Sequence, residues 1–246
     1  MQLNTFSIAA WCPRTGMLGV AVSTAVPGVG GICPFVKPGV GAIATQSWVN
    51  PYLGIDGLVL LEQGMSAAEA LKKLTDEDPD RDVRQVGFVD ALGRPATWTG
   101  SECVPWAGHR SADGVSVQGN MLTGPETVEA MFQAFATAES LDLPERLLCA
   151  LEAGQAAGGD KRGKQSAAVL VYHTELYPLV DLRVDEHRFP VAELRRVFEV
   201  ARHQYVPFMA GLPKRDDPHG ALGENVTSVL MTPPPFRPGG GGGGAP

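Results

Sequence analysis

Residues 5–24 have the sequence TFSIAAWCPRTGMLGVAVST, and this stretch decides the fold class from the start of the chain. Apolar and small polar residues alternate over 3–11, as expected of a strand with one apolar face and one small polar face. The alternation returns over 18–23, after turn residues at 13–16. The stretch therefore predicts an antiparallel hairpin. The small residues on one of its faces leave room for another layer or a ligand, and tight sheet packing explains them equally well.

The rest of the chain predicts strands followed by pairs of helices. Further strands are expected at 40–47, 84–89, 95–99, 115–120, 166–172 and 177–184. Helices are expected at 52–63, 66–74, 125–137, 142–152 and 190–202, with Gly154 closing the fourth and a flexible loop at 27–31. This order is not the strict alternation of a doubly wound parallel sheet, so it predicts an α+β class with mixed or antiparallel sheets and helices outside.

Composition excludes several classes of protein. The 246 residues are 44% hydrophobic, which is enough for a sizeable core. The net charge of −7 gives nucleic acid and anionic membranes little to bind. No apolar run approaches the about 20 residues of a membrane-spanning helix, and no secretory signal precedes the first strand. We therefore expect a cytoplasmic protein without a nucleic-acid or membrane partner.

Neither a cofactor nor a metal is expected. The four cysteines are too widely spaced for a metal or redox motif, and only Cys33, in a Gly-rich loop, is a candidate reactive thiol. The loop at 27–31 lacks the ending of a phosphate-binding motif. Asp181 and Asp185 flank Arg183 on one strand face, which predicts an ion-pair row rather than a metal site.

Six motifs resemble those of the domain-of-unknown-function 1028 family (DUF1028). They are TFSI (5–8), GMLGVAV (16–22), GVGAIATQ (39–46), VQGNML (117–122), AGQAAGGD (153–160) and DLRVD (181–185). The family is classed with the N-terminal nucleophile (Ntn) hydrolases, so the resemblance implies a four-layer αββα sandwich with mostly antiparallel sheets. It covers a domain at 1–205, which leaves a C-terminal extension at 206–231 and a disordered, Pro/Gly-rich tail at 232–246.

The resemblance places Thr5 at the position of the catalytic nucleophile. A threonine hydroxyl attacks a carbonyl only when a base takes its proton. An N-terminal threonine carries this base in its own α-amino group, whose reference pKa is about 7.7 to 8.0. On its residues alone, Thr5 is better explained as an ordinary strand threonine.

Four residues, Met1 to Asn4, precede Thr5, whereas members of the family commonly begin at or next to this threonine. Three explanations are open. The leader is removed, for example by self-cleavage between Asn4 and Thr5; the start codon is misassigned; or the protein is not a working hydrolase.

Amide side chains at strand ends are the next candidates. Gln118 and Asn120 flank a glycine, and Asn120 is the expected oxyanion donor, although both amides also suit local turn hydrogen bonds. Gln46 ends a quoted motif and is expected, with Gln118, to bind substrate.

Lys37 is the only lysine before the first expected helix and is a catalytic candidate by analogy with proteasome-type Ntn enzymes. The alternative is that Lys37 is a solvated loop lysine.

Two polar segments add candidate substrate-binding residues. In the first segment, His109 is a candidate general acid or base, and Arg110 is a candidate to bind a carboxylate of the substrate. The alternative for His109 is a purely structural role. The other segment precedes the strand at 166–172, where the alternative is a basic surface loop; it supplies Asp160, Arg162, Gln165 and Ser166.

These observations predict an Ntn-type amidohydrolase acting on a small amide substrate. The alternative is a non-catalytic protein that binds a small ligand on the same sandwich. The apolar residues at 197–200 and 206–231 are expected to cover the sandwich or to form a homodimer.

Overall fold

The computed structural model describes residues 5–221 and 223–231. The chain divides into two compact units, Met1–Arg196 and Val197–Pro246. The leader at 1–4 and the tail at 232–246 lie outside the described residues, so the expectation of a disordered tail stays a prediction. Among the described residues, no helix combines the length and the apolar character that crossing a bilayer requires.

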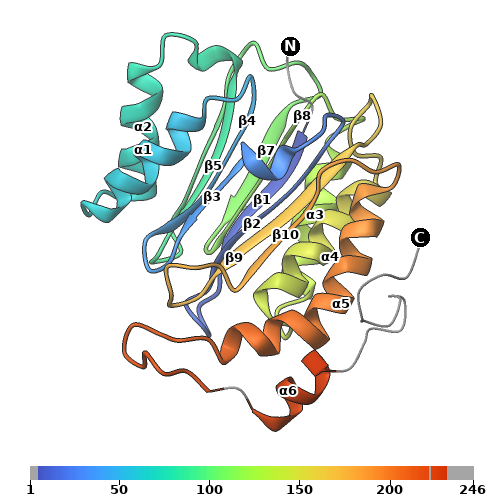
Figure 1. Cartoon of the computed structure of the whole chain (residues 1–246). Coiled ribbons are helices and arrows are strands. Elements are labelled where there is room, and N and C mark those ends of the chain that lie inside the picture. Colours follow the sequence, from blue (N-terminus) through green and yellow to red (C-terminus); the bar gives the residue numbers. More distant parts are fainter. Residues whose placement is uncertain (1–4, 222, 232–246) are drawn as a thin grey trace. The chain divides into compact units, whose positions relative to one another are not determined.

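The first unit contains a six-stranded antiparallel sheet (Figure 1). Its strand order is β10-β9-β2-β1-β8-β7. The strands are β1 (Thr5–Trp11), β2 (Leu18–Thr24), β7 (Gly108–Ala112), β8 (Val115–Asn120), β9 (Ser166–Tyr172) and β10 (Val180–Val184). The predicted hairpin is confirmed: β1 pairs with β2 from Thr5 opposite Thr24 to Trp11 opposite Leu18.

A second, four-stranded antiparallel sheet faces the first. Its order is β3-β4-β5-β6, with β3 (Pro34–Lys37), β4 (Gly41–Ser47), β5 (Arg84–Asp90) and β6 (Pro95–Thr99). The strands predicted at 84–89 and 95–99 are present as β5 and β6, which pair antiparallel. The α+β class with antiparallel sheets is therefore confirmed.

Pairs of helices cover the outer faces of both sheets (Figure 1). α1 (Pro51–Glu62) and α2 (Ala67–Glu77) pack on the four-stranded sheet, and α3 (Glu126–Thr137) and α4 (Leu143–Ala156) on the six-stranded sheet. Ser66 forms the predicted capping box with Glu69, and Asp142 caps α4 by accepting a hydrogen bond from the Glu145 N–H. Local capping chemistry thus sets where these helices begin.

Two local predictions, those for Gly154 and Cys33, were wrong, and two strands were missed. Gly154 does not end α4, which runs to Ala156; a Cβ at Gly154 would lie 2.6 Å from Met131 Cγ, so this glycine allows α3 and α4 to pack closely. The short strands β3 and β7 were not predicted, and the loop at 27–31 contains the 3-10 helix Val29–Gly31. Cys33 is fully buried, and burial raises the pKa of its thiol, which contradicts a reactive role.

Apolar side chains fill one half of the space between the sheets. They include Leu18, Val20 and Val22 of β2, which pack with Val36 of β3 and Ala42 of β4. These are the residues that the alternation of β2 placed on one face. The other half of the space is polar and contains Thr5.

α5 (Pro190–Ala210) extends beyond its predicted end at residue 202 and contains Pro207. Its first two turns belong to the first unit, where Arg195 forms ion pairs with Glu145 and Glu152 of α4. The second unit contains the remainder of α5 and also α6 (Glu224–Met231), which was not predicted. The role of this unit as a cover or as a dimer interface stays a prediction.

Candidate functional site

Thr5 is the first residue of β1, near the middle of the six-stranded sheet, and its neighbours across the ladder are Thr24 and Asn120. Alternation along β1 turns Thr5 and Ser7 toward the opposite sheet, where Ser7 bonds to β4, while Phe6 turns toward the end of α4. The Thr5 side chain is 1% exposed, and its hydroxyl donates a hydrogen bond to Thr24 Oγ1 at 3.2 Å.

Gln46, at the end of β4, connects the two sheets at this point. Its Oε1 accepts a hydrogen bond from Ser7 Oγ at 2.6 Å. Its Nε2 donates to the Thr5 carbonyl oxygen at 3.2 Å, to Gln85 Oε1 at 2.7 Å and, at 3.5 Å, to Asn120 Oδ1. One amide therefore holds the backbone of Thr5 and orients two further amides.

Gln118 extends the same system along β8. Its Nε2 donates to Ser7 Oγ and its Oε1 accepts from Ser116 Oγ, both at 2.6 Å. Gly87 of β5 lies against these groups: a Cβ there would be 2.0 Å from Gln118 Oε1. The position requires glycine because the buried amide occupies the space of a side chain.

Gln85 carries the hydrogen bonds toward the surface. Its Nε2 donates to the Gly119 carbonyl at 2.8 Å and to Thr99 Oγ1 at 2.9 Å. The Thr99 hydroxyl lies 2.9 Å from Nδ1 of the exposed His109. We call the following residues, each at most 1% exposed, the amide network: Thr5, Ser7, Gln46, Gln85, Ser116, Gln118 and Asn120.

Ser7, Gln85 and Thr99 were not identified from the sequence. The available signal was the alternation of polar side chains along strands that are otherwise buried, as at 5 and 7 and at 116, 118 and 120. Such a pattern indicates a polar face inside the protein because each buried polar group needs a partner.

Strained backbone follows two members of the network. Ser47 directly follows Gln46 and has φ 68°, and Met121 directly follows Asn120 and has φ 57°. Neither residue is glycine, so each left-handed conformation costs free energy, and such residues cluster at functional sites. The strain marks the end of the sandwich that contains Thr5.

Three predicted substrate-binding residues brace the loops around Thr24. Asp160 accepts hydrogen bonds from the Ala25 N–H at 3.1 Å and the Arg162 N–H at 2.8 Å, and Arg162 also forms an ion pair with it. Ser166 Oγ donates to the Val26 carbonyl at 2.6 Å.

Gln165 is anchored at the same place, because its backbone N–H donates to the Thr24 carbonyl at 2.8 Å. These contacts are internal to the protein, so a role of the four residues in substrate binding stays a prediction.

Lys37 is not brought to Thr5. It pairs with Gly41 at the far end of β4, five residues or about 16 Å from Gln46 along the strand. Its ammonium forms an ion pair with Glu62 of α1 at 2.5 Å. This position does not support the catalytic role that was expected for it.

The predicted ion-pair row is present in part: Arg183 pairs with Asp181, and Asp185 lies beyond the end of β10. Arg183 Nε donates to Asp181 Oδ1 at 2.9 Å, and its second nitrogen donates to Oδ2 at 3.1 Å. Within residues 5–221 and 223–231, the side chains of His, Cys, Asp and Glu form no cluster of three or more that could hold a metal ion.

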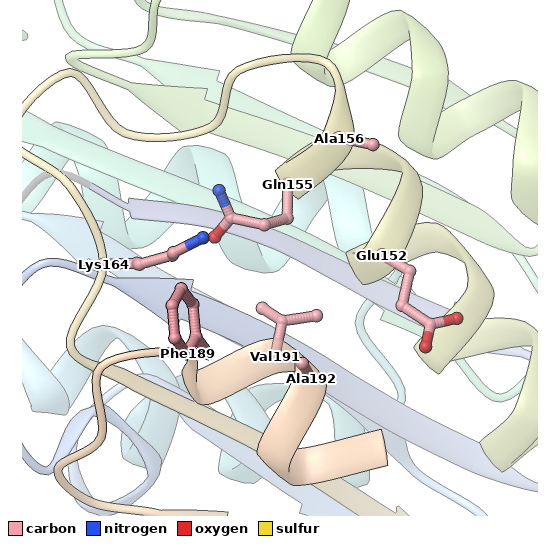
Figure 2. A pocket seen from close by; sticks show the side chains of 7 residues that line it. All are labelled: Glu152, Gln155, Ala156, Lys164, Phe189, Val191 and Ala192. Atoms are coloured by element: carbon pink, nitrogen blue, oxygen red, sulfur yellow. The ribbon is translucent and has the colours of Figure 1, made fainter. Parts of the chain in front are cut away.

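Cavities in the first unit include the following two. One, of about 630 Å³, is lined by Trp106, His109 and Arg110 together with the start of α3. The other, of about 330 Å³, lies between the end of α4 and the start of α5, where Gln155 and Lys164 extend toward one another above the Phe189 ring (Figure 2).

Comparison with known proteins places the chain in a family. A comparison with curated proteins finds no match. Anbu (ancestral beta-subunit) from Yersinia bercovieri aligns at 14% identity with a TM-score of 0.36, over 85% of this chain and 98% of its own. The crystal structure of protein SPO2555 from Silicibacter pomeroyi is 33% identical, with a TM-score of 0.82, and the alignment covers 90% of this chain and 96% of that one. The model of a family of unknown function, DUF1028, matches residues 5–194. The chain therefore belongs to the DUF1028 family.

Proposed function

We propose that this protein is an amide hydrolase of the N-terminal nucleophile type, in which Thr5 becomes the nucleophile after cleavage of the Asn4–Thr5 bond. The observation that carries the proposal is the position of Thr5. Thr5 is the first residue of a central strand. Its hydroxyl faces the space between two sheets, and buried amides surround it. The placement of one helix pair outside each sheet supports the layer order that the family resemblance implies.

The base in this mechanism is the α-amino group of Thr5 itself. The side-chain partner of the Thr5 hydroxyl is the hydroxyl of Thr24, which is not a base at neutral pH. Cleavage of the Asn4–Thr5 bond frees an amine whose reference pKa is about 7.7 to 8.0. This amine takes the hydroxyl proton as Oγ1 attacks the substrate carbonyl.

The remaining steps follow acyl-transfer chemistry. The amine returns its proton to the leaving nitrogen, the C–N bond breaks, and an ester links the acyl group to Thr5. Water then hydrolyses the ester, which releases the acid and restores the threonine. Asn120 is the proposed oxyanion donor: its Oδ1 accepts from Gln46, which makes Nδ2 the donor end of the amide.

Intact-mass measurement of the purified chain tests the proposal without a known substrate. We expect a mature chain that begins at Thr5, and a Thr5→Ala variant that retains the leader while remaining folded. Thr5→Ser keeps a hydroxyl and should still be processed. A wild-type chain that retains Met1 or Gln2 and yet hydrolyses amides at full rate would disprove the mechanism.

Two further results are expected once a substrate is found. Activity should rise between about pH 7 and 8, with titration of the α-amine, rather than near the histidine value of about 6.5. Asn120→Ala should lower turnover by about 10² to 10³ if Asn120 stabilises the oxyanion.

The second candidate function is non-catalytic binding of a small ligand. The observation in its favour is that Thr5 is only 1% exposed and that its hydroxyl and its carbonyl both have internal partners. An intact leader combined with tight ligand binding and no amidase activity would favour this function.

A further inference from the structure

A cavity of about 630 Å³ lies beside β7, an edge strand of the six-stranded sheet, and is lined by Trp106, His109, Arg110 and the first turns of α3. We propose that this cavity binds a small uncharged aromatic carboxamide, and that its occupation is transmitted to Thr5 through a chain of hydrogen bonds that begins at His109. The proposal goes beyond hydrolysis and does not require cleavage of the leader.

Trp106 supplies an aromatic surface next to His109. The six-membered ring of its indole lies against the backbone of Gly108: a Cβ at that glycine would be 2.6 Å from Trp106 Cη2. The ring is thus held by the strand β7 and lines the cavity. Aromatic rings pair favourably with other aromatic rings, so this surface suits an aromatic ligand.

We assign to His109 the tautomer in which Nδ1 carries no proton. Thr99 Oγ1 lies 2.9 Å from both Gln85 Nε2 and His109 Nδ1, and in this assignment it accepts from the former and donates to the latter. The ring proton is then on Nε2. Desolvation by the surrounding protein lowers the pKa of His109, although the residue is partly open to solvent, and this shift favours the neutral ring. His109 therefore offers the ligand a neutral N–H donor.

The charges around the cavity disfavour an anion. Arg110 is paired with Glu129, and its guanidinium lies 4.0 Å from the centre of the Phe132 ring. Glu126 adds a second carboxylate to the lining, so one positive and two negative charges leave a net charge of −1. A carboxamide matches these groups, because its carbonyl accepts from the His109 N–H and its own N–H groups suit a carboxylate.

Hydrogen bonds connect this cavity to Thr5 without a gap. A hydrogen bond joins Thr99 Oγ1 and His109 Nδ1, Gln85 donates to Thr99, and Gln46 donates both to Gln85 and to the Thr5 carbonyl. Hydrogen bonds in a connected series polarise one another, and Gln85, Gln46 and Thr5 are buried. A ligand that reorients His109 therefore changes the hydrogen bonding of Gln85 and Gln46.

Titration of the isotope-labelled full-length chain with benzamide, followed by NMR, tests binding. We expect shifts of the Trp106 indole and the His109 ring, and much weaker effects from benzoate and benzylammonium at the same concentrations. His109→Leu should weaken binding about tenfold, as loss of a hydrogen bond implies. His173→Leu is the matched control, because His173 is an exposed histidine outside this cavity whose side chain contacts Thr15. Equal binding of benzoate or of benzylammonium, or no response at Trp106 and His109, would overturn the proposal.

A separate variant tests whether ligand binding is transmitted from His109 to Thr5. Thr99→Val should leave benzamide affinity within about twofold but abolish the ligand-induced shifts of the Gln46 and Gln85 side-chain amides, and Thr99→Ser should restore them. Shifts that persist in Thr99→Val would refute transmission through Thr99. Because neither measurement depends on processing, a leader that stays intact would disprove the hydrolase mechanism without affecting these results.

Discussion

At the scale of single residues, one glycine determines how closely the two sheets approach each other beside Thr5. Gly87 leaves room for the Gln118 amide and the Ser116 hydroxyl, and a Cβ there would lie 2.0 Å and 2.4 Å from their oxygens. Since both oxygens belong to buried, hydrogen-bonded side chains, neither can move without losing a partner.

We therefore expect Gly87→Ala to lower the free energy of unfolding by about 1–3 kcal/mol, through overpacking of a buried position. Chemical denaturation followed by circular dichroism measures this change. Gly31→Ala is the control, because the nearest atom to a Cβ at that position is Arg183 Nη1, at 3.8 Å. Equal stability of the two variants would show that the sheets can separate to accept the methyl group.

The family resemblance singled out Thr5 and Gln46, and the two amides that flank a glycine at a strand end singled out Gln118 and Asn120. The partners of Gln85 could not be identified in this way, since they depend on how β5 pairs with β6 and faces β8 of the other sheet. Lys37 illustrates the opposite error: spacing along the chain does not show that β3 and β4 carry this lysine away from Thr5.

At the scale of elements, a buried ion pair joins the end of α2 to the start of β5. Arg84 Nε donates to Asp78 Oδ2 at 3.0 Å, and the same guanidinium donates to the Trp48 carbonyl after β4 at 2.8 Å. Asn50 also donates to the Asp78 carboxylate, at 3.2 Å. The pair therefore fixes the ends of β4 and β5, which carry Gln46 and Gln85.

Arg84→Met should lower the free energy of unfolding by about 3–5 kcal/mol at pH 7, because it leaves the Asp78 carboxylate buried without its cation. Burial raises the pKa of Asp78, but hydrogen bonds from Arg84, the Asp80 N–H and Asn50 outweigh it, so the pKa is lowered overall. The ion pair therefore stabilises the protein above the unfolded pKa of about 3.9 and is lost as pH falls through the lower, folded value.

Urea denaturation at pH 7 and pH 3 measures both effects. The difference between wild type and Arg84→Met should shrink at the lower pH, where protonation of Asp78 removes the unpaired charge. Lys72→Met, in an exposed pair with Asp76 on the same helix, should leave the urea midpoint unchanged. A difference between wild type and Arg84→Met that is the same at both pH values would rule out Asp78 as its source.

Elements with local signals were predictable, and those that depend on a partner strand were not. α2 and α4 begin at capping residues that bond within four positions of the chain. In contrast, β3 and β7 are short edge strands whose pairing is set by β4 and β8. Their sequences, PFVK and GHRSA, have no alternation long enough to indicate a strand.

At the scale of the whole molecule, composition predicts where proteolysis starts. Residues 233–246 are nearly all proline and glycine, which bury too little apolar surface to offset their ordering entropy. Limited proteolysis of the full chain should remove this stretch first and leave a cooperatively unfolding core that contains residues 5–205. A first cut near residue 110 that yields two stable halves would disprove a single domain over this range.

The two halves of the space between the sheets make unequal contributions to how the sheets are aligned. Aliphatic contacts of the kind made by Val20 and Val36 change little when one sheet slides past the other by a fraction of an ångström, because they are not directional. The amides of Gln46, Gln85 and Gln118 accept only one alignment, since hydrogen bonds weaken steeply with distance and angle. The apolar half therefore holds the sheets together, and the polar half selects the single offset between them at which Thr5 is positioned.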